Sequence, residues 1–253
     1  MAGFRPGPDP DFPYLSENDR YAFPDPLNCE DDIVAIGGNL SPGMLLSAYE
    51  QGIFPWYNPG DPVIWQSPDP RFLIYPEKLH VSASMRKVLR RGEFEIAFDR
   101  DFAAVIKGCA EAERPGQGGT WITGEIIDAY TELHRLGWAH SAEAYLDGEL
   151  AGGCYGIFLG GAFFGESMFA RQPDASKAAF LSLARFLFAG GAAFIDCQVP
   201  TGHLYSLGGE ALSREAFLAL LAKTRSLRRP GNSDATDLRG SWEKETAPPL
   251  SSA

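Results

Sequence analysis

Two kinds of hydrophobic pattern divide the chain into expected helices and strands. Apolar residues at helical spacing predict helices at 82–91, 101–113, 124–136, 175–189 and 214–223, and a further helix that begins at Ser41 and Pro42. Strand-like patterns predict strands at 94–98, 139–146, 149–159, 161–169 and 193–199. The order of these elements predicts an α+β fold in which helices flank a mostly antiparallel central sheet.

Proline usage changes near residue 70. Thirteen of the 19 prolines lie in the first 76 residues, and proline is excluded from helix interiors and central strands. The first quarter is therefore expected to be rich in loops, with short elements only. We expect a small proline-rich N-terminal domain at 1–70, a main domain at 71–225, and a disordered polar tail at 226–253.

Composition and charge narrow the classes of protein that fit. The 253 residues are 45% hydrophobic and 22% charged, which excludes a wholly disordered chain. The net charge of −11 excludes a protein that coats nucleic acid by bulk electrostatics, so any contact with nucleic acid must be local. The chain shows neither a membrane-spanning apolar run nor a secretory signal, so we expect a cytoplasmic protein without a membrane partner.

The cysteines and histidines show no metal-binding pattern. Cys29, Cys109, Cys154 and Cys197 are scattered along the chain without a CxxC pair, and the four histidines are equally dispersed. We therefore expect free thiols, no metal site and no cofactor.

Two loops carry residues that suit ligand contact. Phe54, Trp56 and Trp65 crowd a proline-rich stretch, where rigid aromatic faces suit stacking on bases; a small aromatic core under a loop is the alternative. The loop at 119–124 contains Trp121 and precedes a helix whose N-terminus favours anions, and an ordinary flexible loop is the alternative there.

Two strand segments place polar side chains among apolar ones. Glu166 lies between apolar neighbours, where a buried carboxylate would need a partner or a function; a solvent-facing glutamate is the alternative. Strand alternation puts Asp196 and Gln198 on one face. The aspartate can then accept a hydrogen bond from the glutamine amide and leave the amide oxygen aimed elsewhere. A satisfied polar pair on a half-exposed strand is the alternative.

The expected helix at 82–91 carries a dense positive cluster. Arg86, Lys87, Arg90 and Arg91 form like-charge pairs at i,i+4, which mildly destabilise an isolated helix. Such a cluster suits contact with phosphates, although charge alone slightly favours a solvated helix face.

These segments together form a family pattern. The sequence contains, in this order, GIFPWYNPGDPVIW, SPDPR, TWIT, GESMF, DASK, IDCQV and HLYSLG. From about residue 36 to about residue 221 the chain closely resembles the bacterial leucyl/phenylalanyl-tRNA–protein transferases. The resemblance implies an enzyme that moves Leu or Phe, and less readily Met, from aminoacyl-tRNA to an acceptor protein beginning with Arg or Lys, which creates a degradation signal. It also implies a C-terminal domain similar to the GNAT acetyltransferase fold, and we expect a monomer.

The resemblance implies roles for matching residues. Asp196 and Gln198 match the catalytic pair, and Trp56 and Trp121 match the indoles that hold the terminal adenosine. The implied pocket for the amino-acid side chain consists of Cys154, Phe163, Glu166, Phe180, Leu183 and Leu187. The resemblance also reverses the interpretation of the basic cluster, because Arg86, Lys87, Arg90 and Arg91 match a patch expected to bind the tRNA acceptor region.

Two departures from the family pattern bear on specificity. Cys154 stands where many relatives have methionine, which enlarges the pocket, and Pro200-Thr-Gly-His203 replaces a common asparagine before the histidine. For the chemistry we expect aminolysis of an ester without a covalent intermediate. The Gln198 oxygen would orient the amine, and Asp196 would orient Gln198.

Two other functions fit parts of the pattern. An acetyl-CoA-dependent N-acetyltransferase would share the fold, but the chain has no clean match to the phosphate-cradling pattern Q/R-x-x-G-x-G/A. A non-catalytic tRNA- or peptide-binding module would keep the aromatic loop and show no transfer.

Overall fold

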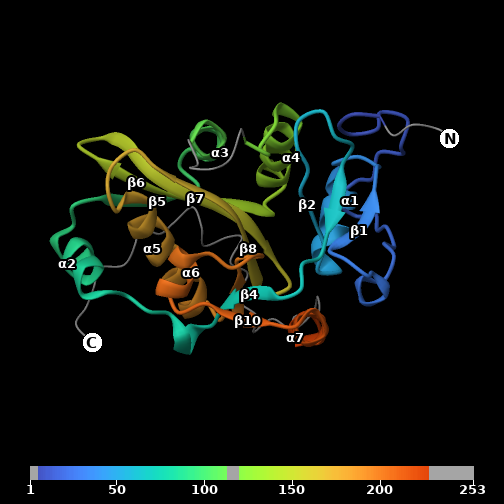
Figure 1. Cartoon of the computed structure of the whole chain (residues 1–253). Coiled ribbons are helices and arrows are strands. Elements are labelled where there is room, and N and C mark those ends of the chain that lie inside the picture. The colour runs from blue at the N-terminus through green and yellow to red at the C-terminus, as the bar shows by residue number, and fades with distance from the viewer. Residues whose placement is uncertain (1–4, 113–119, 228–253) are drawn as a thin grey trace.

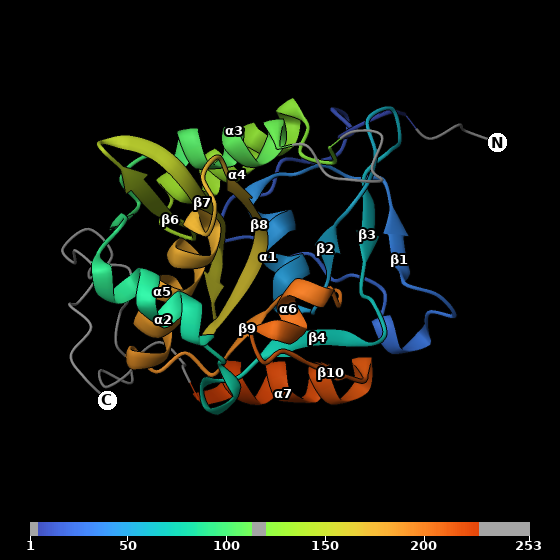
Figure 2. The ribbon, with the colours of Figure 1, turned by 60° about the vertical axis from the view of Figure 1, so that its left-hand side comes forward.

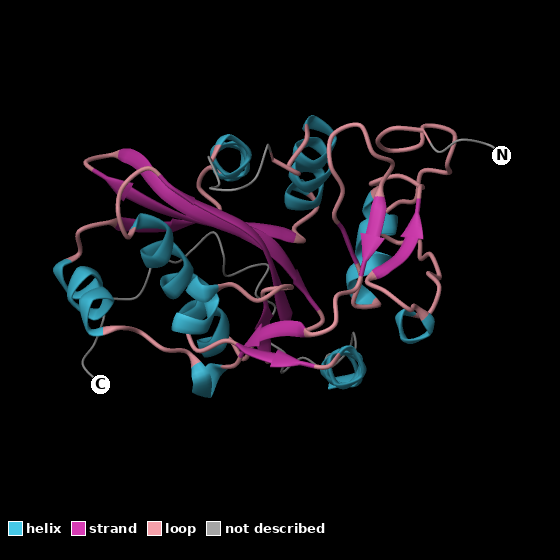
Figure 3. Ribbon diagram, in the orientation of Figure 1, coloured by secondary structure: helices cyan, strands magenta, loops and turns pink. Residues whose placement is uncertain are grey.

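A seven-stranded sheet covered by helices on both faces forms the main body of the protein (Figure 1). The computed structural model describes residues 5–112 and 120–227, so residues 228–253 of the expected tail lie outside the described residues. Helices α3 and α4 lie against one face of the sheet and α5 lies against the other, with α2 packed on α5 (Figure 3). No described helix has the length and apolarity that crossing a bilayer requires.

Capping residues set the ends of several helices. The helices are α1 (Pro42–Glu50), α2 (Ala83–Arg91), α3 (Phe102–Glu111), α4 (Gly124–Arg135), α5 (Ala175–Ala189), α6 (Gly202–Ser206) and α7 (Arg214–Leu227), with 3-10 turns at Pro26–Asn28 and Pro76–Lys78. The side chains of Ser82, Asp101 and Thr123 accept hydrogen bonds from backbone N–H groups in the first turns of α2, α3 and α4. Gly92 ends α2 in the left-handed conformation, with φ 62°.

The main sheet has the strand order β10-β4-β9-β8-β7-β6-β5. Its strands are β4 (Arg71–Ile74), β5 (Glu95–Phe98), β6 (Ala139–Leu146), β7 (Glu149–Leu159), β8 (Ala162–Ala170), β9 (Phe194–Asp196) and β10 (Glu210–Leu212). The pairing of β8 with β9 is parallel, and the other pairings in this sheet are antiparallel. The two-residue turn between β6 and β7 forms because Asp147 and Gly148 both adopt positive φ, 52° and 82°.

A small antiparallel sheet lies beside α1, on the N-terminal side of residue 70 (Figure 2). It consists of β1 (Ile33–Ile36), β3 (Ile64–Gln66) and β2 (Phe54–Pro55), with β3 in the middle. Tyr49 and Trp65 of this part belong to the same buried hydrophobic cluster as Phe164 and Phe194 of the main sheet. The N-terminal part therefore shares a core with the main sheet.

The expected mixture of helices and strands is confirmed, and several bounds agree closely. The strands at 139–146 and 149–159 and the helix at 175–189 match the structure residue for residue. The expected strand at 193–199 is wrong at its end: β9 stops at Asp196, and Gln198 has a φ of 64° that no strand residue adopts. The sequence analysis missed α6 and the strands β1, β2, β3, β4 and β10, which are too short to show a hydrophobic period.

Candidate active site

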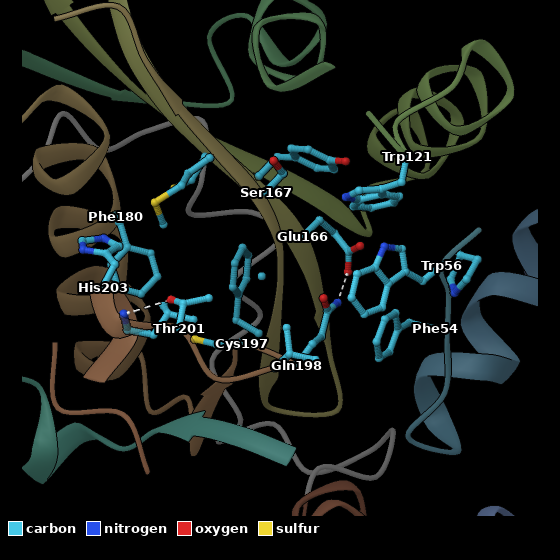
Figure 4. Close-up of a pocket in the computed structure, with 18 residues that line it drawn as sticks. Phe54, Trp56, Trp121, Glu166, Ser167, Phe180, Cys197, Gln198, Thr201 and His203 are labelled. Atoms are coloured by element: carbon cyan, nitrogen blue, oxygen red, sulfur yellow. Dashed lines mark hydrogen bonds between the residues drawn. The ribbon is translucent and has the colours of Figure 1, made fainter. Parts of the chain in front are cut away.

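An apolar cavity of about 360 Å³ opens where β8, the end of β9 and the chain after β2 meet (Figure 4). Seven of the residues expected at the site line this cavity: Trp56, Trp121, Cys154, Phe163, Glu166, Phe180 and Gln198. Its wall also includes Phe54, which the sequence analysis placed in the aromatic loop, and residues that it did not assign, among them Tyr155, Ser167, Met168, Cys197, Thr201, His203 and Leu204.

A bulge in β8 directs Glu166 toward this cavity. Across the β7–β8 pair, Tyr155 is opposite Ser167 and Gly156 is opposite Gly165, so Glu166 is an extra residue without a partner on β7. Such bulges turn a side chain out of the regular alternation of a strand. Gly156 permits the close approach at this point, since a Cβ on it would lie 2.1 Å from the carbonyl oxygen of Phe164.

Glu166 is held by three side chains. The hydroxyl of Tyr49 donates to its Oε1 at 2.7 Å, the hydroxyl of Tyr130 donates to its Oε2 at 3.2 Å, and Nε2 of Gln198 donates to Oε1 at 3.0 Å. The Tyr49 and Tyr130 hydroxyl oxygens also lie within hydrogen-bonding distance of each other, and both tyrosines are fully buried. Because the two hydroxyls have only two protons for these three contacts, all three hydrogen bonds form together only when Glu166 is protonated. Burial raises the pKa of Glu166 to about 7, despite the opposing effect of the tyrosine hydrogen bonds.

The parallel pairing of β8 and β9 brings Gln198 to Glu166. Phe164 is opposite Asp196 in this pair, and both chains then continue two residues in the same direction toward the cavity. Gln198 adopts φ 64°, a left-handed conformation that is unfavourable for a residue with a side chain. Its backbone N–H donates to Oδ1 of Asp196 at 2.8 Å, which holds the turn.

Asp196 therefore contacts Gln198 in a way that the sequence analysis did not expect. The expected hydrogen bond from the Gln198 side-chain amide to Asp196 is wrong, because that amide donates to Glu166 and Asp196 receives the backbone N–H. The cause is the turn at Gln198, which removes it from the strand alternation that the prediction assumed. Asp196 is fully buried and does not line the cavity.

Arg71 at the start of β4 neutralises Asp196. Its Nε donates to both carboxylate oxygens at 2.9 and 3.0 Å, and its Nη2 donates to Oδ2 at 2.7 Å. Both side chains are fully buried, and Nη1 of Arg71 donates to the carbonyl oxygen of Gly52. The guanidinium also lies over the rings of Phe54 and Phe217, 4.9 and 4.5 Å from their centroids.

The two tryptophans lie on one side of the cavity, close to each other (Figure 4). Trp56 is 36% exposed, and its ring stacks on Phe54 with 6.4 Å between centroids. Trp121 belongs to the short segment before α4 and is half-buried. Partly exposed indoles on supported loops can stack on a planar ligand without a large ordering cost.

Phe180 and His203 lie on the opposite side of the cavity (Figure 4). Phe163 of β8 and Cys154 of β7 are buried parts of the same apolar wall. Two residues expected in this pocket, Leu183 and Leu187, are fully buried in the interior and are not part of the wall. Burial raises the pKa of the Cys154 thiol well above its usual value, so the group stays protonated and is a poor nucleophile.

The basic cluster lies on α2, outside the cavity. Arg86, Lys87, Arg90 and Arg91 are all exposed, while Met85 is buried against the rest of the fold. Arg86 donates to the carbonyl oxygen of Val81, and Arg91 pairs with Glu93 at 3.2 Å. The cluster presents charge to solvent and is separate from the wall of the cavity.

Sequence reasoning missed three residues that support the site: Arg71, Tyr49 and Tyr130. Arg71 and Asp196 are 125 positions apart, and Tyr49 and Glu166 are 117 apart, so no local spacing links them. The available signals were Arg71 in the SPDPR motif and Tyr49 on the apolar stripe of the first helix. Within the described part of the chain, no group of three or more His, Cys, Asp or Glu residues is arranged to hold a metal ion.

Two solved structures resemble this fold at low sequence identity. One, described as the structure of L-PGS from Bacillus licheniformis, has a TM-score of 0.41 and 12% identity, covering 64% of this chain and 66% of that chain. Another, a GCN5-related N-acetyltransferase from Kribbella flavida, has a TM-score of 0.35 and 14% identity, covering 68% of this chain and 62% of that chain.

Comparison with protein families and curated proteins gives a closer match. A family model described as leucyl/phenylalanyl-tRNA protein transferase matches residues 73–222, and the model for the N-terminal domain of that family matches residues 38–69. The leucyl/phenylalanyl-tRNA–protein transferase of Anaeromyxobacter dehalogenans (strain 2CP-C) is 51% identical over 231 residues, 91% of this chain and 96% of that protein. The protein of the same name from Myxococcus xanthus (strain DK1622) is 49% identical over 234 residues, which cover 92% of this chain and 97% of that protein. The chain belongs to the leucyl/phenylalanyl-tRNA–protein transferase family.

Proposed function

We propose that this protein transfers a leucyl or phenylalanyl group, and less readily a methionyl group, from tRNA to the N-terminal amine of an acceptor protein. The names of its relatives and the apolar cavity beside a fixed carboxamide support this function. The acceptor begins with Arg or Lys, and the new N-terminus marks it for degradation. The protein acts in the cytoplasm as a monomer and uses no cofactor.

The reaction is the aminolysis of an ester. The amine nitrogen bonds to the ester carbonyl carbon, the bond from that carbon to the ribose oxygen breaks, and a proton passes from the amine to the ribose oxygen. An α-amine has a pKa of about 8, so a useful fraction is neutral near pH 7 without a strong base. Because the ester is already activated, positioning of the two reactants supplies much of the rate.

Gln198 positions the attacking amine through its side-chain oxygen. The Nε2 of Gln198 donates to Oε1 of Glu166, so the NH₂ group of the carboxamide faces the carboxyl group. The Oε1 atom of Gln198 takes part in no hydrogen bond among the described residues and can accept one from the amine. Asp196 acts as a positioning residue, since it holds the backbone of Gln198 and not the substrate.

The rest of the cavity accommodates the aminoacyl end of the tRNA. Trp56 and Trp121 hold the terminal adenosine by stacking, and the apolar side chain of the amino acid lies toward Cys154, Phe163 and Phe180. The exposed basic cluster on α2 meets phosphates of the acceptor region.

We also propose two domains with a boundary near residue 70. The two family models, which match residues 38–69 and 73–222, support this division. The main domain is similar to the GNAT fold.

A transfer assay tests the function. The observation that carries the proposal is the Gln198 carboxamide held by a buried carboxylate on the wall of an apolar cavity. Radiolabelled leucyl-tRNA is supplied with two otherwise identical acceptor proteins, one beginning with Arg and one with Ala. We expect transfer to the first only, and a Gln198→Ala variant that still binds leucyl-tRNA but transfers at least tenfold more slowly.

Other outcomes would reject parts of the proposal. Equal transfer to both acceptors would reject the proposed acceptor specificity. Binding of leucyl-tRNA without any transfer would indicate a non-catalytic module. Binding of coenzyme A in place of aminoacyl-tRNA would indicate an N-acetyltransferase, which the family match does not favour.

A further inference from the structure

A second pocket of about 550 Å³ lies next to the cavity. It is lined by His80, Ser82, Ser84, Met85, Lys177, His203, Tyr205, Ser206, Leu207 and Gly208. His203 on α6 belongs to the walls of both the cavity and this pocket. The two pockets are therefore neighbours, with His203 between them.

The lining of the second pocket suits an anion. Among the described residues that form it, none carries a carboxylate, although the chain as a whole has a net charge of −11. The ammonium of Lys177 pairs with Asp174 at 3.1 Å, and its other N–H groups remain as donors. Ser82 and Ser84 stand at the N-terminus of α2, where the helix dipole adds positive potential.

Electrostatic coupling links Lys177 to His203. Burial, and then the charge of Lys177, lowers the pKa of His203, so this imidazole is neutral at pH 7 and can donate or accept one hydrogen bond. The ammonium of Lys177 is then the main positive charge offered by these two residues.

Close backbone packing holds the shape of the pocket. The N–H of His80 donates to the carbonyl oxygen of Leu207 at 2.9 Å. Gly208 has φ 89°, and a Cβ on it would lie 1.8 Å from the carbonyl oxygen of Lys78, so only glycine fits there. These contacts hold the segment at 207–208 against the segment at 78–80 on one side of the pocket.

An exposed aromatic ring stands at the same pocket. Tyr205 on α6 is 56% exposed, and it is anchored by an edge-on contact with Phe72, 4.7 Å between centroids. Proteins that bind single-stranded nucleic acid combine such anchored aromatic rings with cationic groups that contact phosphates.

The second pocket lies between His203 of the cavity wall and the helix that carries the basic cluster. Ser82, Ser84 and Met85 of α2 line it, and Arg86, Lys87, Arg90 and Arg91 follow on the same helix, which is about 13 Å long. We propose that this pocket binds the single-stranded RNA next to the terminal adenosine, with a backbone phosphate at Lys177 and a base stacked on Tyr205. The inference rests on the proposed function, because it assumes that the cavity holds the aminoacyl adenosine.

Two substrates of different length test this subsite. Leucyl-tRNA reaches it, whereas leucyl-adenosine, which lacks every phosphate, ends within the cavity. Transfer kinetics are measured with both substrates for Lys177→Gln and Tyr205→Leu, where leucine keeps an apolar contact with Phe72. Lys107→Gln and Tyr14→Ala are matched controls, since both residues are exposed and lie outside the two pockets.

We expect each subsite variant to raise the KM for leucyl-tRNA about tenfold, with kcat little changed, and to leave both constants for leucyl-adenosine unchanged. The salt dependence of tRNA binding separates the two contacts. Lys177→Gln should reduce the slope of log K against log salt by about 0.7, and Tyr205→Leu should leave it unchanged.

The other results would overturn the inference. Unchanged KM for leucyl-tRNA in both variants would show that the RNA does not enter the pocket. Equal losses with leucyl-tRNA and leucyl-adenosine would show that the two residues only support the cavity. If the unaltered protein transferred leucine from neither substrate, the proposed function itself would fail.

Discussion

Glu166 and Glu143 are both buried carboxyl groups whose pKa is raised to about 7 by burial, yet only Glu166 lies at the cavity. Glu143 lies on β6 beside the start of α3, where it accepts hydrogen bonds from Ser141 Oγ at 2.6 Å and from the backbone N–H of Asp101. Its Oε2 atom has no hydrogen-bond partner among the described residues. The same pKa shift therefore arises at two very different places in the fold.

The difference lies in what each carboxylate holds. Glu166 is a bulged residue that fixes Gln198 on the wall of the cavity, and the hydroxyls of Tyr49 and Tyr130 fix it in turn. Glu143 links β6 to the start of α3 through its hydrogen bonds. Among the described residues, none of its hydrogen bonds reaches the wall of the cavity. A raised pKa indicates burial, and the partners and the cavity indicate function.

A third buried carboxylate, Asp196, should show the largest effect on stability. Asp196→Ala leaves the Arg71 guanidinium buried and without its charge partner, which we expect to lower the free energy of unfolding by about 3–5 kcal/mol. Urea denaturation measures this loss. Asp196→Asn keeps an acceptor oxygen and should lose less, and the double change Arg71→Met with Asp196→Leu should recover much of the loss. A cost below about 1 kcal/mol for Asp196→Ala would contradict a fully buried ion pair.

The pH dependence of stability should reveal both glutamates. Their folded pKa of about 7 exceeds the usual 4.5, so the folded state binds more protons than the unfolded state between these values. The contribution of these two groups to stability is therefore fully present below about pH 4.5, and it is lost as the pH rises through 7. A shift of this size corresponds to about 3 kcal/mol per group, at 1.36 kcal/mol per pH unit.

Urea denaturation at pH 5 and pH 8 checks this sign. Glu143→Gln and Glu166→Gln should each reduce the loss of stability between the two pH values. If the free energy of unfolding of the wild-type protein fell no more between pH 5 and pH 8 than that of either variant, the raised pKa values would be contradicted.

Turnover should separate the two glutamates. Glu166→Gln weakens the one hydrogen bond by which Glu166 fixes Gln198, because an amide oxygen is a weaker acceptor than a carboxylate. We therefore expect kcat for transfer to fall about tenfold, with a small change in the KM for leucyl-tRNA. Glu143→Gln is the matched control and should leave kcat within about twofold. Equal losses of kcat in the two variants would mean that buried carboxylates affect turnover only through stability.

Local sequence signals predicted the helices and long strands well, but they predicted the side-chain contacts of the site poorly. The sequence pair Asp147-Gly148 is a strong turn signal between β6 and β7, and the pair Gly190-Gly191 that follows α5 is a helix stop, so the bounds of these elements could be predicted locally. The family resemblance indicated seven residues of the cavity wall. The bulge at Glu166 and the turn at Gln198 depend on pairing between strands that are distant in sequence, so no local pattern encodes them. For the same reason, the contacts of Asp196 with Arg71 and of Glu166 with Tyr49 emerged only from the structure.

The smallest expected effect is a change in amino-acid preference. It concerns the apolar side of the cavity, which the buried carboxylates do not contact by hydrogen bonds. Cys154 is buried in the cavity wall, and Cys154→Met would add two heavy atoms there. We expect the ratio of kcat/KM for phenylalanyl-tRNA to that for leucyl-tRNA to fall roughly threefold to tenfold, since a bulkier wall disfavours the larger side chain. Cys29→Met, at a half-buried position outside the cavity, should leave the ratio unchanged. An unchanged ratio in Cys154→Met would show that the amino-acid side chain does not extend to this wall, and Glu166 and Gln198 would then have to orient a substrate that lies differently.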